Sequence, residues 1–285
     1  MSTTQTGSNA AIDYRYIGKD PDNYVCLEED GECEEDELYR IIGIIPTQKE
    51  VNGEFEYRVK LIKSTNYAGS KAESSSYAQG GLGYRWSGSR DNKSSDWTAS
   101  TLNTEILNGA KAETEDSYWD SISDYNDYID DTIWYLGAQA AKEHTPQNFY
   151  INERGTARGS ADGLNNYRTK AKIGLMYPSD YGYATSGGSE EKRSECLSSI
   201  FSSDWGSKSD GLCAGNDWLY DGYYQWTITT DYDTSGWVWG VASGQIGYNT
   251  AYYVIWSVRP VFHLASNVNY LDGTGSHDDP YLISL

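Results

Sequence analysis

From Asn216 to Val258 the chain contains no Lys, Arg or Glu, although this stretch is rich in Tyr, Trp, Thr, Asp and Gly. An ordinary solvated surface needs such charged residues, and an ordinary core would not carry so much Asp and Tyr. Aromatic and β-branched residues favour strands, while Gly, Asn and Asp favour turns. The stretch therefore predicts short strands joined by turns. The strand candidates are WTIT, WVWGV and YYVIWSVRPVFHL.

The N-terminal part contains two β-rich segments, LYRIIGII (38–45) and FEYRVKLIKS (55–64). The linker PTQKEVNGE joins them, and its Asn52-Gly53 pair is a strong hairpin signal. The second segment alternates with a period of two, which is typical of a strand with two different faces. One face carries Phe55, Tyr57, Val59 and Leu61, and the other carries Glu56, Arg58 and Lys60.

Helix signals are weaker. In WTASTLNTEILNGA, Ser100 can cap a helix and Gly109 can end it. The segment YWDSISDYNDYIDD has helical character, but its many Asp residues weaken it. KAKIGLMYPSDYGYAT (170–185) predicts a strand that enters a turn at Pro178.

No convincing repeat and no linker rich enough to separate two domains is present. The simplest interpretation is one loop-rich α+β domain over residues 14–285, with short antiparallel strands and one or two helices. Residues 1–13 are polar and predict a disordered lead.

The chain has 42 Asp and Glu against 22 Lys and Arg, which gives a net charge of −20. Phosphate binding needs a cationic surface, so the charge argues against nucleic acid and against an anionic membrane surface as partners. No run approaches the roughly 20 apolar residues of a membrane span, so we expect no membrane insertion.

The four cysteines fall into two local pairs. Cys26 and Cys33 flank LEEDGE, while Cys196 and Cys213 flank a longer loop. An even count at short spacings favours two disulfides and an oxidising location, which predicts an extracellular, cell-surface or virion protein. A zinc site fits less well, because neither pair has CxxC spacing and no His lies close to either. Four reduced cysteines in a cytosolic protein are the alternative.

No catalytic or cofactor motif stands out. His144, His263 and His277 form no ligand spacing, and the chain has no GxSxG nucleophile elbow. The turn from Asp272 to Asp279 could hold Ca²⁺ through its oxygens, although it lacks the ligand order of an EF-hand. We therefore predict no metal, no cofactor and no enzymatic activity.

Several motifs occur in a fixed order: KIGLMYPSDYGYAT, Cys196 and Cys213, WLY, WTIT, VWGV, SVRPVFHL and DGTGSHDDPYLI. This series resembles an uncharacterised family of surface proteins of gut Firmicutes and their phages. The N-terminal motifs YIG, NYVC, LYRIIGII, YRVKLIK, STLNTEILNG and WYLG are similar to the same family, so the resemblance extends from about residue 14 to the end. The C-terminal part of that family resembles the C-type lectin fold, and several members resemble the variable proteins of diversity-generating retroelements.

The resemblance implies a C-type-lectin-like fold with a ligand-display part at about 216–257. It implies structural roles for Trp218, Trp226, Trp239 and Arg259. It also implies a variable, ligand-binding surface, whose candidate residues are Tyr220, Asp221, Tyr223, Tyr224, Thr230, Asp231, Tyr232, Asp233, Ser235, Tyr248, Asn249, Tyr252, Tyr253 and Trp256.

The chemistry of these residues supports the same division. Tyr and Trp give large rigid contact areas, while Ser, Gly and Asn adapt their hydrogen bonds, as in antibody paratopes. Retroelement mutagenesis of adenines converts Asn codons into Tyr, Asp, Ser, Gly, Thr and Ala codons, and this stretch has that composition. Arg259 lies between valines, so we expect it to be buried and bonded to a carboxylate or to loop carbonyls.

The sequence thus predicts an adhesin-type or receptor-type binding protein whose partner is a protein or glycan on another cell or host surface. Three alternatives stay open. One is a carbohydrate-binding lectin in the strict sense. Another is an oxidase related to formylglycine-generating enzymes, although Cys196 and Cys213 are too widely spaced for that family's active cysteines. The last is a purely structural surface or virion module, in which Trp226, Trp237, Trp239 and Trp256 are all buried.

Overall fold

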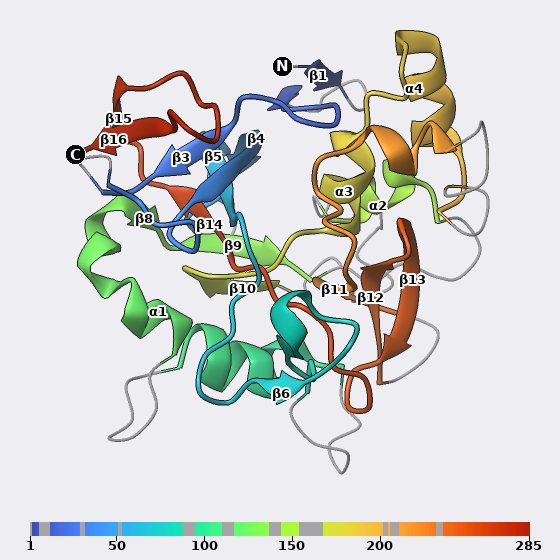
Figure 1. Cartoon of the computed structure of the whole chain (residues 1–285), viewed down its shortest axis with the longest axis horizontal. Helices are drawn as coiled ribbons and strands as arrows, with labels where there is room; N and C mark the ends of the chain where they lie inside the picture. The colour runs from blue at the N-terminus through green and yellow to red at the C-terminus, as the bar shows by residue number, and fades with distance from the viewer. Residues whose placement is uncertain are drawn as a thin grey trace.

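The computed structural model describes residues 2–5, 12–28, 32–50, 53–87, 95–109, 117–136, 144–153, 168–201, 205, 211–231 and 236–285. This part of the chain is a mixture of short strands, short helices and turns, so the prediction of an α+β fold is confirmed. Figure 1 shows a nine-stranded sheet on the left of the view and a three-stranded sheet on the right.

The nine-stranded sheet combines the first and the last strands of the chain. Its main order is β15-β16-β3-β4-β5-β14-β8, with β2 paired to β4 and β1 to β2. The pairing of β16 with β3 is parallel. The strands are β1 (Ser2–Gln5), β2 (Ile12–Arg15), β3 (Tyr24–Cys26), β4 (Tyr39–Thr47), β5 (Glu56–Lys63), β8 (Ile129–Asp130), β14 (Val261–Leu264), β15 (Asn269–Asp272) and β16 (Tyr281–Ser284).

The three-stranded sheet is an antiparallel meander built from the stretch without Lys, Arg and Glu. It consists of β11 (Gln225–Thr230), β12 (Trp237–Ala242) and β13 (Gln245–Thr250). Two smaller pairs complete the strands: β9 (Thr132–Tyr135) with β10 (Arg168–Ala171), and β6 (Glu73–Ser74) with β7 (Leu82–Gly83).

The described residues contain four α-helices, more than the one or two expected, and all are short. They are α1 (Tyr118–Ser121), α2 (Pro146–Glu153), α3 (Pro178–Ala184) and α4 (Glu190–Ser198). Single-turn 3-10 helices cover Gln79–Gly81, Trp97–Ala99 and Ala214–Asn216, a longer one covers Ser123–Tyr128, and Leu102–Leu107 is a π-helix.

Ser100 precedes the π-helix as a cap, since its hydroxyl accepts a hydrogen bond from the Asn103 N–H at 3.1 Å. The turn predicted at Pro178 is instead the start of α3. Pro178 occupies the first turn of this helix, where its missing N–H costs nothing. The Asp180 carboxylate accepts a hydrogen bond from the Tyr177 N–H at 2.8 Å, which caps the same end.

Part of the predicted disordered lead, residues 1–13, is paired: Ser2–Gln5 and Ile12–Arg15 form antiparallel neighbours. Residues 6–11 lie outside the described part of the chain, as does Asn52 of the hairpin signal. The hairpin itself is present, because β4 and β5 pair antiparallel over their length.

The two faces of β5 are arranged in an unexpected way. Phe55 and Tyr57, from the apolar face, are 47% and 49% exposed. Arg58 and Lys60, from the charged face, are 6% and 1% exposed. A charged side chain is buried only where a partner neutralises it. Here the Lys60 Nζ lies 2.5 Å from an oxygen of Asp180, so a carboxylate on α3 allows this cation to be buried. Toward the end of β5 both faces are buried, since Leu61 and Ile62 are each 0% exposed.

The core consists largely of aromatic residues, and a single cluster of buried side chains draws members from both sheets. Its largest fully buried members are Trp86, Trp97, Trp134, Trp205, Trp226 and Trp239. Both predicted disulfides are present, between Cys26 and Cys33 and between Cys196 and Cys213. They favour an oxidising environment. Among the described helices, none has the length and apolar character of a membrane span.

Candidate ligand-binding surface

Two aspartates shape the loop before β11, which carries three of the predicted contact tyrosines. The Asp217 carboxylate accepts a hydrogen bond from the Tyr220 N–H at 2.8 Å. Asp221 accepts one from the Tyr223 N–H at 2.9 Å and another from the Gln225 side chain at 2.8 Å. Asp side chains commonly fix turns in this way. The loop is therefore held by its own carboxylates.

Arg259 is buried and bonds to the backbone of this loop. Its side chain is 4% exposed, and its guanidinium donates hydrogen bonds to the carbonyls of Lys63 at 2.8 Å and of Leu219 at 3.0 Å. This agrees with the expected bonding of a buried Arg to loop carbonyls. The contact ties the loop to the end of β5, so Arg259 orients the surface without being part of it.

Burial has a strong effect on Asp217. Removal from water disfavours the ionised carboxylate and raises the pKa of Asp217 to about 7, although backbone hydrogen bonds act in the opposite direction. The neighbouring charge of Asp221 adds to the increase in the pKa. The geometry of the loop is thus coupled to a carboxyl group that titrates near neutral pH.

Tyr224, at the end of this loop, is partly buried and stacks on a tyrosine from a distant segment. Tyr224 stacks against Tyr77 with ring centroids 5.1 Å apart, and its N–H donates to the Tyr77 carbonyl at 2.9 Å. Tyr224 also makes an edge contact with Trp256, and Trp256 packs on Trp226; the ring centroids are 5.5 Å and 4.3 Å apart. Tyr77 and Tyr223 are 56% and 39% exposed. We call Tyr77, Tyr220, Tyr223 and Tyr224 the tyrosine surface.

The sequence analysis missed Tyr77, because it lies in a Ser- and Gly-rich segment with no alternation. Its position depends on long-range contacts. Ser75 and Gln79, on either side of it, hydrogen-bond to Ile255 and Ser257. No local signal in the chain reports these contacts.

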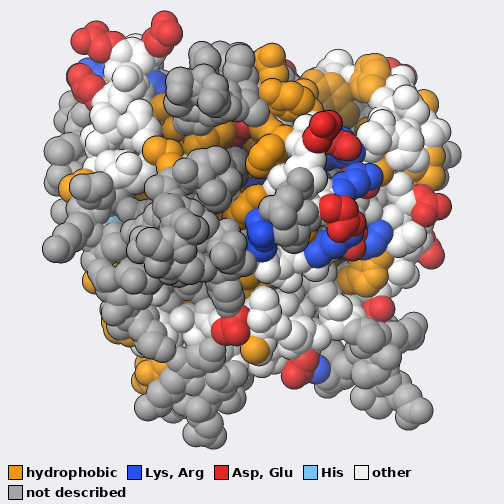
Figure 2. Space-filling model, turned by 180° about the vertical axis from the view of Figure 1, so that it is seen from behind, with side chains coloured by type: hydrophobic (Ala, Val, Ile, Leu, Met, Phe, Trp, Pro, Cys, Tyr) orange, Lys and Arg blue, Asp and Glu red, His pale blue; other side chains and the backbone are white. Residues whose placement is uncertain are grey.

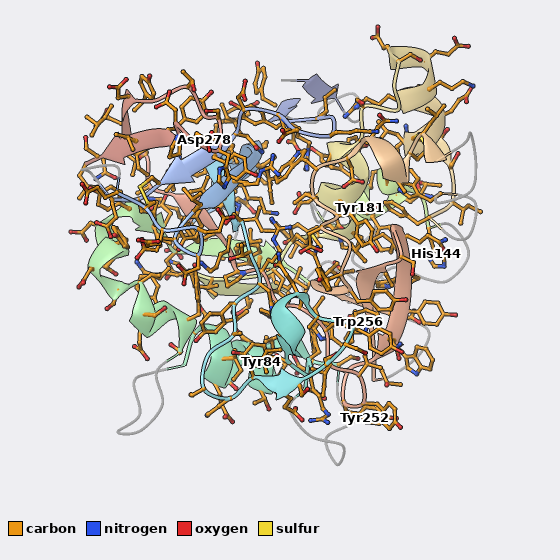
Figure 3. The ribbon with its side chains drawn as sticks, viewed as in Figure 1. Tyr84, His144, Tyr181, Tyr252, Trp256 and Asp278 are labelled. Carbon is orange, nitrogen blue, oxygen red and sulfur yellow. A yellow bond between two sulfur atoms is a disulfide. The ribbon has the colours of Figure 1, made fainter. Side chains whose placement is uncertain are left out.

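A second group of rings lies on the hairpin of β12 and β13. Tyr248 is 44% exposed and contacts Trp237 and Trp239, with ring centroids 5.1 and 4.9 Å away. Tyr253, just after β13, is 57% exposed, and Tyr252 is partly buried. Figure 3 shows Tyr252 at the lower end of this hairpin.

The two groups lie on opposite faces of the three-stranded sheet. Trp239 is opposite Tyr248 in the register, and the next pair is Gly240 with Gly247. Side chains alternate between faces, so position 240 faces away from Tyr248. Trp256 covers that other face, since a Cβ at Gly240 would lie 2.4 Å from its ring. The predicted contact residues therefore form two groups on the two faces of the sheet.

Three candidate contact residues are not at the surface. Trp256, Thr230 and Asp231 are 3%, 7% and 5% exposed, which corrects their expected location. Trp256 fills the space above Gly240, Thr230 belongs to a strand buried along its whole length, and the Asp231 N–H donates to the Trp237 carbonyl at 3.0 Å. Asn249 is partly buried, and its side chain accepts a hydrogen bond from the Thr250 N–H. Tyr232, Asp233 and Ser235 lie outside the described residues.

The residues expected to be structural, Trp218, Trp226 and Trp239, are all buried. Within the described chain, no group of three or more His, Cys, Asp or Glu side chains is arranged to hold a metal ion. In the acidic turn, Asp279 accepts hydrogen bonds from the N–H of Thr274 through both its side chain and its carbonyl. The carboxylate thus closes its own turn.

No protein-family model, curated protein or solved structure matches this chain. We therefore base the proposed function on the tyrosine surface.

Proposed function

We propose that this protein is a binding protein of the adhesin or receptor type, which recognises a protein or glycan on another cell or a host surface. The observation that carries the proposal is that exposed Tyr77 stacks on partly buried Tyr224, whose ring is held edge-on against buried Trp256. Rigid aromatic side chains at a surface bind with little loss of side-chain entropy, and such residues dominate binding energy at interfaces.

The proposal includes a C-type-lectin-like scaffold and diversification by a retroelement. Burial limits the positions at which such variation would be tolerated. Replacing Trp256 would open a cavity in the core, whereas Tyr223, Tyr248 and Tyr253 are exposed. A template repeat beside the gene, with adenine-only mismatches confined to codons of exposed residues, would support diversification. A locus without a reverse transcriptase would count against it.

Two of the alternative functions receive less support. A lectin in the strict sense would use carboxylates to bind sugar hydroxyls, but one oxygen of Asp221 accepts hydrogen bonds from Tyr223 and Gln225, and the other is buried away from the surface. The oxidase alternative needs reactive thiols, and all four cysteines are in disulfides.

The test is binding of the labelled protein to bacterial and host cells and to a glycan array. Tyr77→Ala and Tyr223→Ala should weaken binding at least tenfold, or by about 1.4 kcal/mol. The matched control is Tyr14→Ala, a tyrosine on β2 of the nine-stranded sheet with the same exposed fraction (39%) as Tyr223. Equal binding by all three variants would refute the proposed surface, and thermal unfolding would verify that each variant is folded.

A further inference from the structure

A hollow of about 380 Å³ lies on the nine-stranded sheet, and no residue of the tyrosine surface lines it. Six strands contribute to its lining, through Val25, Ile41, Val59, Leu264, Tyr270 and Ile283. Figure 3 shows Asp278, in the turn between β15 and β16, on the opposite side of the molecule from Tyr252.

The hollow exists because this sheet is curled. Four strands, β16, β3, β4 and β5, lie between β15 and β14 in the sheet order. Flat strands about 4.8 Å apart would place β14 and β15 about 24 Å from each other. Residues 265–268 connect them, and a link of that length spans at most about 17 Å. The sheet therefore bends toward a half-barrel, and the residues that line the hollow come from six of its strands.

The lining is mainly apolar, because β5 turns its apolar face to this side. Tyr57 and Tyr270 form the rim with rings that are 49% and 62% exposed. Asn269 and Ser266 add uncharged polar groups. The Tyr270 hydroxyl already donates to the Gly273 carbonyl, so the ring rather than the hydroxyl is available to a ligand. In the view from behind, hydrophobic side chains reach the surface between charged ones (Figure 2).

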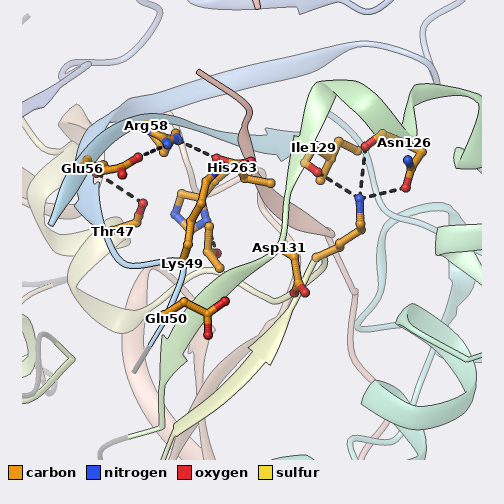
Figure 4. A network of polar contacts seen from close by, with 12 residues as sticks. Thr47, Lys49, Glu50, Glu56, Arg58, Asn126, Ile129, Asp131 and His263 are labelled. Atoms are coloured by element: carbon orange, nitrogen blue, oxygen red, sulfur yellow. Dashed lines mark hydrogen bonds and ion pairs between the residues drawn. The ribbon is translucent and has the colours of Figure 1, made fainter. Parts of the chain in front are cut away.

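Arg58 is the charged residue of the lining, and its charge is already neutralised. Its guanidinium bonds to Asp130 at 2.6 Å, to the Tyr57 carbonyl at 2.9 Å and to Glu56 (Figure 4). An anionic ligand would find no unpaired cation here, and a cationic ligand would lose its hydration without a free carboxylate in the lining. The charge pattern favours an uncharged ligand.

We propose that this hollow binds an uncharged amphiphile, with an alkyl chain against the aliphatic floor and a neutral polar head beside Asn269 and Ser266. Small-molecule sites have this volume range, an apolar lining with few polar groups, and a preference for the mouths of barrels. The site is separate from the tyrosine surface and does not depend on the proposed recognition function.

The test is a calorimetric titration of the full chain with 1-octanol, octanoate and octylammonium. We expect saturable binding of one 1-octanol molecule, and at least tenfold weaker binding of both ions. Bound 1-octanol should also raise the thermal unfolding temperature, because a ligand of the folded state alone stabilises it. Equal affinities for the three compounds, or no saturable binding of 1-octanol, would overturn the proposal.

Variants locate the site. Val59→Asp, in the floor, and Tyr270→Ala, at the rim, should each weaken 1-octanol binding at least tenfold. Tyr253→Ala, a control of similar exposure (57%), should leave it unchanged. If Val59→Asp fails to fold, Tyr270→Ala alone decides. A concentration-dependent dimer in sedimentation that Tyr270→Ala abolishes would identify a second copy as the occupant, and would overturn the small-molecule proposal.

Discussion

Strands β5 and β11 belong to different sheets, and both bury polar side chains. In β5 the buried polar residues are the cations Arg58, Lys60 and Lys63, and the first two are paired with Asp130 and Asp180. In β11 all six residues, QWTITT, are buried and none is charged. The first sheet thus depends on charge pairing between distant segments, and the second depends on packing and neutral hydrogen bonds. The alternation in β5 predicts two different faces, but the burial of Arg58 and Lys60 depends on distant partners that the alternation does not show.

The largest effect should come from removing a charge partner in the first sheet. Asp180→Ala leaves Arg15 and Lys60 buried without this carboxylate, and should lower the free energy of unfolding by about 3–5 kcal/mol. In β11, Thr229→Ala removes a neutral buried group and should cost about 1 kcal/mol. Denaturant unfolding measures both losses, and similar values would contradict the contrast.

The loop before β11, next to the three-stranded sheet, also contains a buried ionisable group, the Asp217 carboxyl. The pKa of Asp217 is about 7 in the folded protein against the ordinary 3.8, so the folded state retains a proton that the unfolded chain releases. The contribution of Asp217 to stability should therefore be complete below about pH 4 and decline as the pH rises toward 7, by an amount on the order of 4 kcal/mol at about 1.4 kcal/mol per pKa unit.

Asp217→Asn retains the acceptor oxygen for the Tyr220 N–H but does not titrate. Its free energy of unfolding should lack this decline and should exceed that of the original protein at pH 8. The measurement is denaturant unfolding at several pH values. A variant with the same pH dependence as the original would show that Asp217 is not the group responsible.

The two disulfides offer a comparison that does not depend on charge. In the chain-entropy model, stabilisation grows with the length of the closed loop. Cys196–Cys213, with a separation of 17 residues, should contribute about 3 kcal/mol, and Cys26–Cys33, with a separation of 7, about 2 kcal/mol. Thermal unfolding of the two double Cys→Ser variants tests this order. The reverse order would mean that local strain outweighs loop length.

The smallest effect should come from His277, which joins the turn between β15 and β16 to Glu35, just after the first disulfide loop. Its ring nitrogens lie 3.0 Å from Asp278 and 2.7 Å from Glu35, and hydrogen bonds to these carboxylates raise the pKa of His277. The stabilisation by these two hydrogen bonds is therefore complete below the ordinary His pKa of 6.5. It is lost as the pH rises through the higher pKa that His277 has in the folded protein. Because the side chain is half exposed, we expect less than about 1 kcal/mol.

His277→Gln should lower the unfolding temperature slightly at pH 5 and leave it unchanged at pH 9. Thermal unfolding at both values, beside the original protein, measures the difference. An equal loss at both pH values would assign the effect to packing against Tyr24, whose ring is 5.1 Å from that of His277.

Several elements could be predicted from the sequence because their signals are local. The β4–β5 hairpin has alternation on both sides of a turn, and each disulfide joins cysteines within one loop. The bonding of Arg259 to backbone carbonyls also followed from its position between valines.

The remaining features depend on contacts between distant segments. Tyr77 belongs to the tyrosine surface only because its loop pairs with residues 255–257. Trp256 is buried because Gly240 leaves room for its ring. The burial of Lys60 in β5 depends on Asp180, which lies on a helix that was predicted as a turn. In each case the deciding partner is more than ten residues away, where periodicity carries no information.

The parallel pairing of β16 with β3 has a consequence for the order in which the protein is made. The N-terminal strands cannot complete their sheet until the last few residues of the chain have been synthesised. Contacts between the two ends of a chain are slow to form, because a long loop has to close first. The principal sheet therefore stays unfinished while the residues between β3 and β16 are synthesised, and its completion is a late step of folding.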